Sequence, residues 1–311
     1  MSLERVLITG GGGQLASDLE ALLAERSQVH AHPRTELDVL NDGAVARAVE
    51  AAAPQVVFNC AAFHNVEVCE REEDQSFAVN ASAVKRLGER CAEAGAKLVH
   101  LSTNYVFDGT APEPYGEDEL PNPRSIYGLS KLAGEYAALA YAPDALVVRG
   151  AGLYGLHGSA SKGGNFVTRM LGRAREQGRL RMVSDQRLSP TFTADLGAAL
   201  VEAVEARATG LVHLTAFGAC SWLEFTEAIM EIAAVEVPIE AVRTTRAPGA
   251  ADRPLNGVLA RPAADAAGLS PLREWREALA DYMTRAGLAC TPPEAPVFTP
   301  CADPRSTRSR A

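Results

Sequence analysis

RVLITGGGGQLA, residues 5–16, joins a short β-branched run to four glycines and the beginning of a helical pattern. Arg5–Thr9 is predicted as a strand and Gln14–Glu25 as a helix, so the glycines form the turn between them. A strand, a glycine turn and a helix in this order are typical of the first βαβ unit of a dinucleotide-binding domain.

Within the turn, Gly10 and Gly13 fit the outer spacing of a G-x-x-G-x-x-G/A sequence, and Ala16 takes the third small position. Residues without a Cβ atom let backbone N–H groups approach a pyrophosphate, and the N-terminus of the following helix adds its partial positive charge. The turn therefore predicts a cofactor site that also includes the first helical residues, Gln14 and Leu15.

The rest of the first half alternates strand-like and helix-like runs, as a parallel sheet covered by helices requires. We therefore expect an α/β fold with a doubly wound parallel (Rossmann) sheet and a smaller C-terminal substrate domain. The predicted strands are 28–31, 55–59, 97–101, 145–149 and 211–214, and the predicted helices are 42–52, 73–94, 127–141, 165–176 and 193–205.

After residue 149 the alternation of strand-like and helix-like runs is replaced by a glycine-rich loop and mostly helical runs. We expect residues 1–149 and about 190–215 to form the dinucleotide-binding domain, and about 150–189 and 216–287 to form the substrate domain. Residues 288–311 are rich in Pro, Ser, Thr and Arg, lack periodicity, and are predicted to be a disordered tail.

Composition excludes several classes of protein. The net charge of −9 argues against nucleic-acid binding, and charges interrupt every apolar run, so no membrane span is predicted. The N-terminus lacks a signal-peptide pattern, which predicts a cytoplasmic protein. The six cysteines form no C-x-x-C pair and the six histidines show no ligand spacing, so we expect no metal.

The sequence indicates the choice between NAD and NADP less clearly than the dinucleotide site itself. The second strand ends in HAHPR (residues 30–34) without the acidic residue that holds the ribose hydroxyls of NAD. Arg34 can pair with a 2′-phosphate, which favours NADP and leaves NAD open, and a solvated loop cation is the competing interpretation. Asp38 and Val39, a little further on, are candidates for the adenine edge.

Tyr127 and Lys131 lie four residues apart, on one face of a predicted helix. A cation beside a phenol stabilises the phenolate and lowers a pKa that is otherwise about 10. A ketone that accepts hydride becomes an alkoxide and needs a proton from such an acid. Alone, such a pair is more often part of the surface, but this one follows a predicted strand that ends in Ser102 and Thr103, in the half that carries the glycine turn. In this context the pair predicts the proton donor of a carbonyl reductase.

With these features, the chain resembles the extended short-chain dehydrogenases/reductases that act on nucleotide sugars, and within them the dTDP-4-dehydrorhamnose reductases. The matching segments run in order along residues 5 to about 285. They are the glycine turn, NCAAF (59–63), VN (79–80), STNYVFDG (102–109), YGLSKLAGE (127–135), NF (165–166), DQ (185–186) with PT (190–191), SW (221–222) and RP (253–254).

The resemblance implies hydride transfer to the C4 ketone of a nucleotide-linked 4-keto-6-deoxy sugar, in the cleft between the domains. Thr103 would hydrogen-bond the ketone, Tyr127 would donate the proton, and Lys131 would tune Tyr127 and hold the nicotinamide ribose. Ser102, Ala61 and Ala62 would line the cofactor groove. The expected partner is a nucleoside-diphosphate sugar, and a homodimer is left open.

The resemblance also implies a set of substrate-binding residues. Asn104 and Tyr105 would lie in the sugar pocket, and Asn165 and Gln186 would face the nucleotide. Arg253 would reach the diphosphate. A helix cap competes as the role of Asn165, a turn as that of Gln186, and a surface ion pair as that of Arg253.

Three positions depart from the family pattern: Asn104 replaces an aspartate, Gly152 a tryptophan beside the sugar, and Leu188 a glycine. They put the identity of the sugar in doubt, but not the hydride chemistry. Two alternatives stay open. One is an epimerase of the same superfamily, and the other is a non-catalytic NADP-binding subunit resembling the beta subunit of methionine adenosyltransferase.

Overall fold

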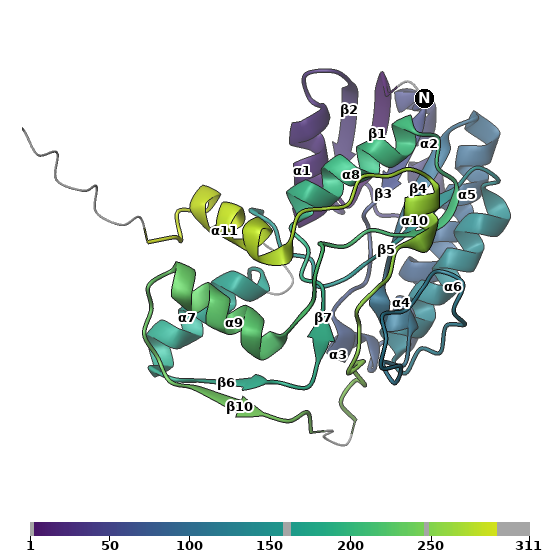
Figure 1. The fold of residues 1–311 in the computed structure, drawn as a ribbon. Helices are drawn as coiled ribbons and strands as arrows, with labels where there is room; N and C mark the ends of the chain where they lie inside the picture. The colour runs from purple at the N-terminus through teal and green to yellow at the C-terminus, as the bar shows by residue number, and fades with distance from the viewer. Residues whose placement is uncertain (1–2, 158–162, 246–248, 291–311) are drawn as a thin grey trace, which may run out of the picture.

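A six-stranded sheet in the order β2-β1-β3-β4-β5-β8 forms the centre of the computed structural model, which describes residues 3–157, 163–245 and 249–290 (Figure 1). Every pair of neighbouring strands is parallel, and the chain runs outward from β1 to β2 before it returns to β3. This doubly wound topology confirms the predicted fold class. The strands are β1 Arg5–Thr9, β2 Gln28–His32, β3 Val56–Asn59, β4 Lys97–Thr103, β5 Leu146–Gly150 and β8 Gly210–His213.

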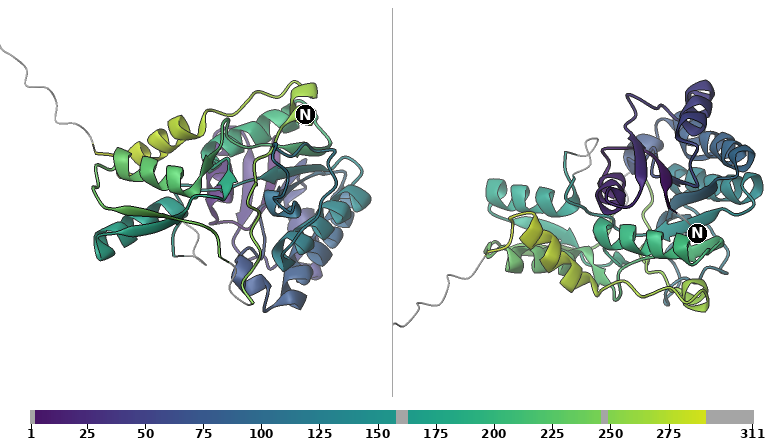
Figure 2. Two further views of the ribbon diagram at one scale, coloured as in Figure 1. Left: turned by 60° about the horizontal axis from the view of Figure 1, so that its bottom comes forward. Right: turned by 90° about the horizontal axis from the view of Figure 1, so that it is seen from above.

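Helices cover both faces of this sheet, because successive side chains of a strand point to opposite sides. Ile8 packs in one core cluster with residues of α1 and α8, whereas its neighbour Leu7 packs in another with residues of α2, α5 and α6. Figure 2 shows helices on both sides of the sheet. The sheet is therefore apolar on both faces, as buried parallel sheets are. The helices are α1 Gln14–Leu23, α2 Asp42–Ala52, α5 Ala83–Ala94, α6 Ile126–Tyr141 and α8 Thr193–Glu205; the short helices α3 Val66–Cys69 and η2 Asn104–Val106 follow β3 and β4.

A smaller, mostly helical region lies beside the carboxyl ends of the strands. Its core is rich in aromatic rings, in which Tyr154 contacts Phe192, Phe225 and Tyr282. Two strand pairs, β6 with β10 and β7 with β9, border it. Its elements are α7 Phe166–Gln177, β6 Leu180–Val183, β7 Arg187–Leu188, β9 Cys220–Ser221, α9 Trp222–Ile232, β10 Ile239–Val242 and α11 Trp275–Arg285.

The helix predicted over residues 73–94 is not continuous. A π-helical turn, Ala78–Ser82, separates α4 (Glu73–Phe77) from α5. Asn80, in the turn, is buried and exchanges hydrogen bonds of 2.8 and 2.9 Å with the backbone of Phe63, and also donates to Ser130 Oγ at 3.0 Å. The hydrogen bonds of this buried amide outweigh the helical pattern of the sequence, and such turns are frequent at functional sites.

Two C-terminal segments also differ from the sequence expectation. Residues Pro262–Ala266 form α10, and Ala264 packs into the core of the first region and not of the second. Leu288 and Ala289 pack against the second core, and Cys290 N donates to Ile232 O at 3.0 Å, so the chain is ordered to Cys290. The rest of the predicted disordered tail, 291–311, lies outside the described residues. Among the described residues, no helix is long and apolar enough to span a bilayer.

Candidate active site

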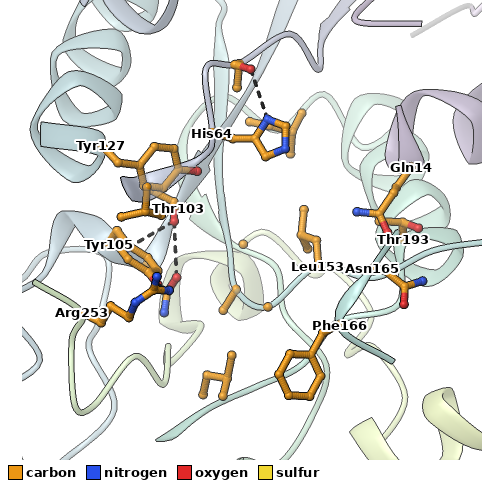
Figure 3. Close-up of a pocket in the computed structure, with 18 of the residues that line it drawn as sticks. Gln14, His64, Thr103, Tyr105, Tyr127, Leu153, Asn165, Phe166, Thr193 and Arg253 are labelled. Atoms are coloured by element: carbon orange, nitrogen blue, oxygen red, sulfur yellow. Dashed lines mark hydrogen bonds between the residues drawn. The ribbon is translucent and has the colours of Figure 1, made fainter. Parts of the chain in front are cut away.

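A cavity of about 590 Å³ lies where the two regions meet, within the size range of small-molecule sites. Figure 3 shows Thr103, Tyr105 and Tyr127 on one side of it and Gln14, Asn165 and Thr193 on the other. Its walls come from the glycine turn, the ends of β3, β4 and β5, helices α6 and α7, and the loop residues 253–254. This is the carboxyl edge of the sheet, where open α/β folds bind ligands.

The glycine turn approaches the sheet too closely for a side chain. Gly10 has a φ of +75°, and a Cβ atom there would lie 2.8 Å from the backbone N of Ala61. Gly13 precedes α1 and lines the cavity together with Gln14 and Leu15. The amide oxygen of Gln14 accepts a hydrogen bond of 2.8 Å from Gly155 N, so this side chain also ties the turn to the loop after β5.

Helix α6 presents Tyr127 and Lys131 to the cavity because two of its glycines allow close contact. A Cβ atom at Gly128 would lie 2.1 Å from Tyr105 O, and one at Gly134 would lie 2.1 Å from Asn80 O. Any larger residue at either position would push the helix, and with it the phenol and the ammonium, away from β4.

Tyr127 and Thr103 lie on the same side of the cavity. Burial raises the pKa of Tyr127, and the neighbouring hydroxyl of Thr103 opposes this shift. Thr103 Oγ1 also donates to Asn104 Oδ1 at 3.3 Å and accepts from Tyr105 N at 3.2 Å. The phenol is therefore a neutral acid at ordinary pH, positioned beside a second hydroxyl.

Lys131 is enclosed behind the phenol. Burial lowers its pKa to about 8, whereas the charge of Glu135 and the thiol of Cys60 act in the opposite direction. Its ammonium donates to Leu101 O and lies 3.4 Å from His100 Nε2. These contacts fix a positive charge one helical turn from Tyr127.

Below the site, a buried ion pair joins α6 to β5. Arg149 contacts both carboxylate oxygens of Glu135, at 2.9 and 2.7 Å, and both side chains are nearly inaccessible. Ser102 Oγ donates to the same carboxylate at 2.5 Å. Ser102, predicted to bind cofactor, thus lines the cavity while its hydroxyl faces the ion pair.

Arginines also line the cavity. Arg253 lies 2.7 Å from Glu67 Oε1 and donates to the hydroxyl of Tyr105 at 3.4 Å. Arg169, on α7, also lines the cavity, and burial together with the charges of Arg173 and Arg253 lowers its pKa. Several guanidinium groups within electrostatic range of one cavity wall make it suited to an anion.

Asn165 and Gln186 line the cavity, but their side chains are also engaged within the protein. Asn165 caps α7 by accepting from Thr168 N and donates to Gly155 O and to the hydroxyl of Tyr282. Gln186 donates to Thr244 Oγ1 at 3.0 Å. The helix cap weighed as an alternative for Asn165 is present in the structure.

Gly10 and three further predicted cofactor residues, Arg34, Asp38 and Val39, do not line the cavity. Arg34 is largely exposed and lies 3.7 Å from Asp38. Ala61 is also absent from the lining, although it abuts Gly10, and its neighbour Ala62 is present.

Several lining residues were not predicted from the sequence: His64, Leu153, Phe166, Arg169 and Thr193. Arg169 follows Asn165 by one helical turn, a spacing that marks the same helix face. Phe166 belongs to the NF segment that matches the family pattern, but it was not named as a site residue, and His64, Leu153 and Thr193 carry no local signal. In the described ranges, no group of His, Cys, Asp and Glu could hold a metal ion.

Comparison with known proteins assigns this architecture to a family. The family model "RmlD substrate binding domain" matches residues 4–287. Spore coat polysaccharide biosynthesis protein SpsK of Bacillus subtilis is 37% identical over 289 residues, which cover 93% of this chain and 100% of that protein. A dTDP-4-dehydrorhamnose reductase of Mycobacterium tuberculosis is 38% identical over 284 residues, or 89% of this chain and 91% of that protein.

Among solved structures, dTDP-4-dehydrorhamnose reductase of Bacillus anthracis in complex with NADP superposes with a TM-score of 0.86 at 33% identity, covering 92% of this chain and 100% of that one. The resemblance predicted from the sequence is therefore confirmed, as is the prediction of an NAD(P)-dependent oxidoreductase. Because the family model spans nearly all of the described chain and relatives exceed 30% identity over most of their length, the chain belongs to the RmlD substrate binding domain family.

Proposed function

We propose that this chain reduces the C4 ketone of a nucleoside-diphosphate-linked 4-keto-6-deoxy sugar, with NADPH as the hydride source. The observation that carries the proposal is that Tyr127 and Thr103 border one side of the cavity, with the buried Lys131 one helical turn from the phenol. A carbonyl reductase needs such an acid beside a site for a polarised ketone.

The residues present fit a dinucleotide. A Cβ atom at Gly10 would lie 2.8 Å from Ala61 N and one at Gly13 would lie 3.0 Å from Gly10 O, so glycines keep the turn tight. The N-terminus of α1 follows directly, and Gly13 and Gln14 line the cavity. When bound, NADPH supplies the hydride that the chain's own residues cannot. Gly10, Gly13, Gln14 and Leu15 would hold its pyrophosphate.

The adenosine half of the cofactor would lie beyond the end of β2. No acidic side chain opposes a 2′-phosphate in the HAHPR segment, and Arg34 is exposed at its end. Asp38 and Val39 would border the adenine. The NADP bound to the Bacillus anthracis reductase supports this choice for a relative of the same architecture.

Thr103 and Tyr127 would both donate to the ketone oxygen. The bond from Thr103 to Asn104 is long, at 3.3 Å, so its hydroxyl can turn to the substrate at little cost. As negative charge develops on that oxygen, Tyr127 would transfer its proton, and the ammonium of Lys131 would stabilise the phenolate. Burial, which raises the pKa of Tyr127, keeps the proton on the phenol until then.

The sugar nucleotide would extend from this point across the second region. Arg253 and Arg169 would meet the diphosphate, and Phe166 and Trp222, whose ring centroids lie 4.3 Å apart, would border the nucleoside together with Asn165 and Gln186. Asn104 and Tyr105 would line the sugar subsite, with Tyr105 held between Tyr127 and Arg253.

The test is NADPH oxidation by the purified protein with dTDP-linked 4-keto-6-deoxyhexoses, with product and cofactor measured together. A reductase consumes one NADPH for each sugar converted. Conversion of a 4-hydroxy nucleotide sugar to its C4 epimer, without net consumption of the cofactor, would identify an epimerase, which returns its hydride. NADP binding without conversion of any keto sugar would favour the regulatory-subunit alternative.

A further inference from the structure

The three positions that depart from the family pattern are far apart in the sequence but lie in one wall of the cavity. Asn104 Nδ2 donates to Gly257 O at 3.1 Å, and Gly257 N donates to Arg187 O at 2.8 Å. Arg187 directly precedes Leu188, and Leu188 contacts the third position, Gly152.

Leu188 fills the space that a side chain at position 152 would occupy. Gly152 has a φ of +55°, and a Cβ atom there would lie 2.6 Å from Leu188 Cδ1 and 3.2 Å from Pro190 Cα. Leu188 is only 5% exposed, yet both it and Gly152 line the cavity. The wall is therefore aliphatic at this point, and its position is set by one leucine side chain.

This wall adjoins the reacting end of the cavity. β4 and β5 pair Thr103 with Gly150, two residues before Gly152. On the other flank, the amide oxygen of Asn104 accepts from Thr103 Oγ1. A ketone bound to Thr103 and Tyr127 would therefore place its neighbouring ring carbons near Leu188.

We infer that Leu188 is a specificity-determining residue, which limits the size of the substituents on the ring carbons that flank the ketone. This inference rests on the proposed function, because it assumes that a keto sugar occupies this part of the cavity. One methylene group of mismatch in an apolar pocket changes discrimination by about 10–200-fold. A leucine side chain in direct contact with the sugar is thus sufficient to select among 4-keto sugars.

The experiment compares two dTDP-linked 4-keto-6-deoxyhexoses that differ by a methyl group on the C3 hydroxyl. We expect Leu188→Ala to raise kcat/KM for the methylated sugar relative to the unmethylated one by at least tenfold. Leu171→Ala is the matched control, because Leu171 is buried in the second core but does not line the cavity. Its ratio should equal that of the wild type, and an unchanged ratio in Leu188→Ala would overturn the inference.

Dissociation constants of both sugars, measured by calorimetry, separate this inference from the proposed function. If the wild type binds the sugars without reducing them, the function is wrong, and Leu188 is still tested by the ratio of the two constants. If neither sugar binds, both proposals fail.

A second variant covers the case in which Leu188→Ala does not fold. Gly152→Ala places a methyl group against Leu188, and we expect kcat/KM for the unmethylated sugar to fall at least tenfold. In a Leu188→Val background, which keeps an apolar side chain but shortens it, the same change should cost at least threefold less, because the shorter side chain opposes it less. Equal losses in both backgrounds, with melting temperatures measured alongside, would show that the two positions do not share this space.

Discussion

The part of the cavity proposed to hold the cofactor and the part proposed to hold the substrate are built in different ways. On the cofactor side, the turn at 10–13 and the pair Tyr127 and Lys131 come from short segments, each within one strand–turn–helix or one helix. On the substrate side, Arg253 meets Glu67 across 186 residues, and Asn104 meets Gly257 across 153. We therefore expect the residues of the hydride transfer to be set by short stretches of sequence, and the residues that select the substrate to be set by contacts between distant segments.

The sharpest way to break this comparison is Tyr127→Phe, which removes only the hydroxyl. Because a positioned acid contributes about 10²–10⁴ in rate, we expect kcat to fall by that factor while KM for the keto sugar changes little. Steady-state kinetics with NADPH measure both. A variant that retains wild-type kcat would exclude Tyr127 as the proton donor.

The ion pair below the site should govern stability more than binding. Glu135→Gln leaves the buried Arg149 without a counter-charge, which costs about 3–5 kcal/mol. Urea unfolding of the apo protein measures this loss. The double variant Glu135→Leu/Arg149→Met is the control, since it leaves no unpaired charge, and it should recover most of the stability. Equal losses in both would contradict the role of the unpaired charge.

The pH dependence should come from the cofactor side. Since the pKa of Lys131 is lowered to about 8, its ammonium loses a proton as pH rises through that value, and kcat/KM should decline about tenfold per unit above it. Lys131→Arg keeps its charge. This variant should be slower at pH 7 but lack the decline near pH 8. A wild-type profile that stays flat to pH 9 would show that the protonation of Lys131 is not required.

The smallest effects are expected at the mouth of the cavity. Arg253 and Glu67 are each 41% exposed, so solvent weakens their pairing, and such pairs contribute about 0.2–1 kcal/mol. Glu67→Gln frees Arg253 for a diphosphate and should lower KM by up to about fivefold, with kcat unchanged. Arg253→Ala should raise KM instead. If both variants raise KM equally, Glu67 supports binding and does not compete with it.

Most of the fold was predictable because strand and helix periodicities repeat along the first half of the chain. The strands at residues 5–9, 55–59 and 97–101 were placed to within a few residues of those observed. The break in the helix at Ala78–Ser82 was not predictable, because it depends on Asn80 reaching Phe63 and Ser130. Helix α10 was not predictable either, because its five residues pack on a sheet whose strands all lie earlier in the chain.

The candidate site divides in the same way. The glycine turn and the Tyr127–Lys131 pair were identified from their spacing together with their position after predicted strands, and Gly13, Tyr127 and Lys131 line the cavity. Arg169, Phe166 and Leu153 were missed, since their contribution depends on the seating of the second region against the sheet. Arg253 was named as a candidate for the diphosphate, whereas its partner in the ion pair, Glu67, was not named from the sequence.

The sequence by itself therefore determined the sheet, the glycine turn and the Tyr127–Lys131 pair, because each needs particular residue types at short, regular spacing. Only the tertiary structure decided that Asn104, Gly152 and Leu188 form one wall, and that Leu188 occupies the space beside Gly152. Close packing couples side chains by their distance in space, and that distance has no periodic trace along the chain.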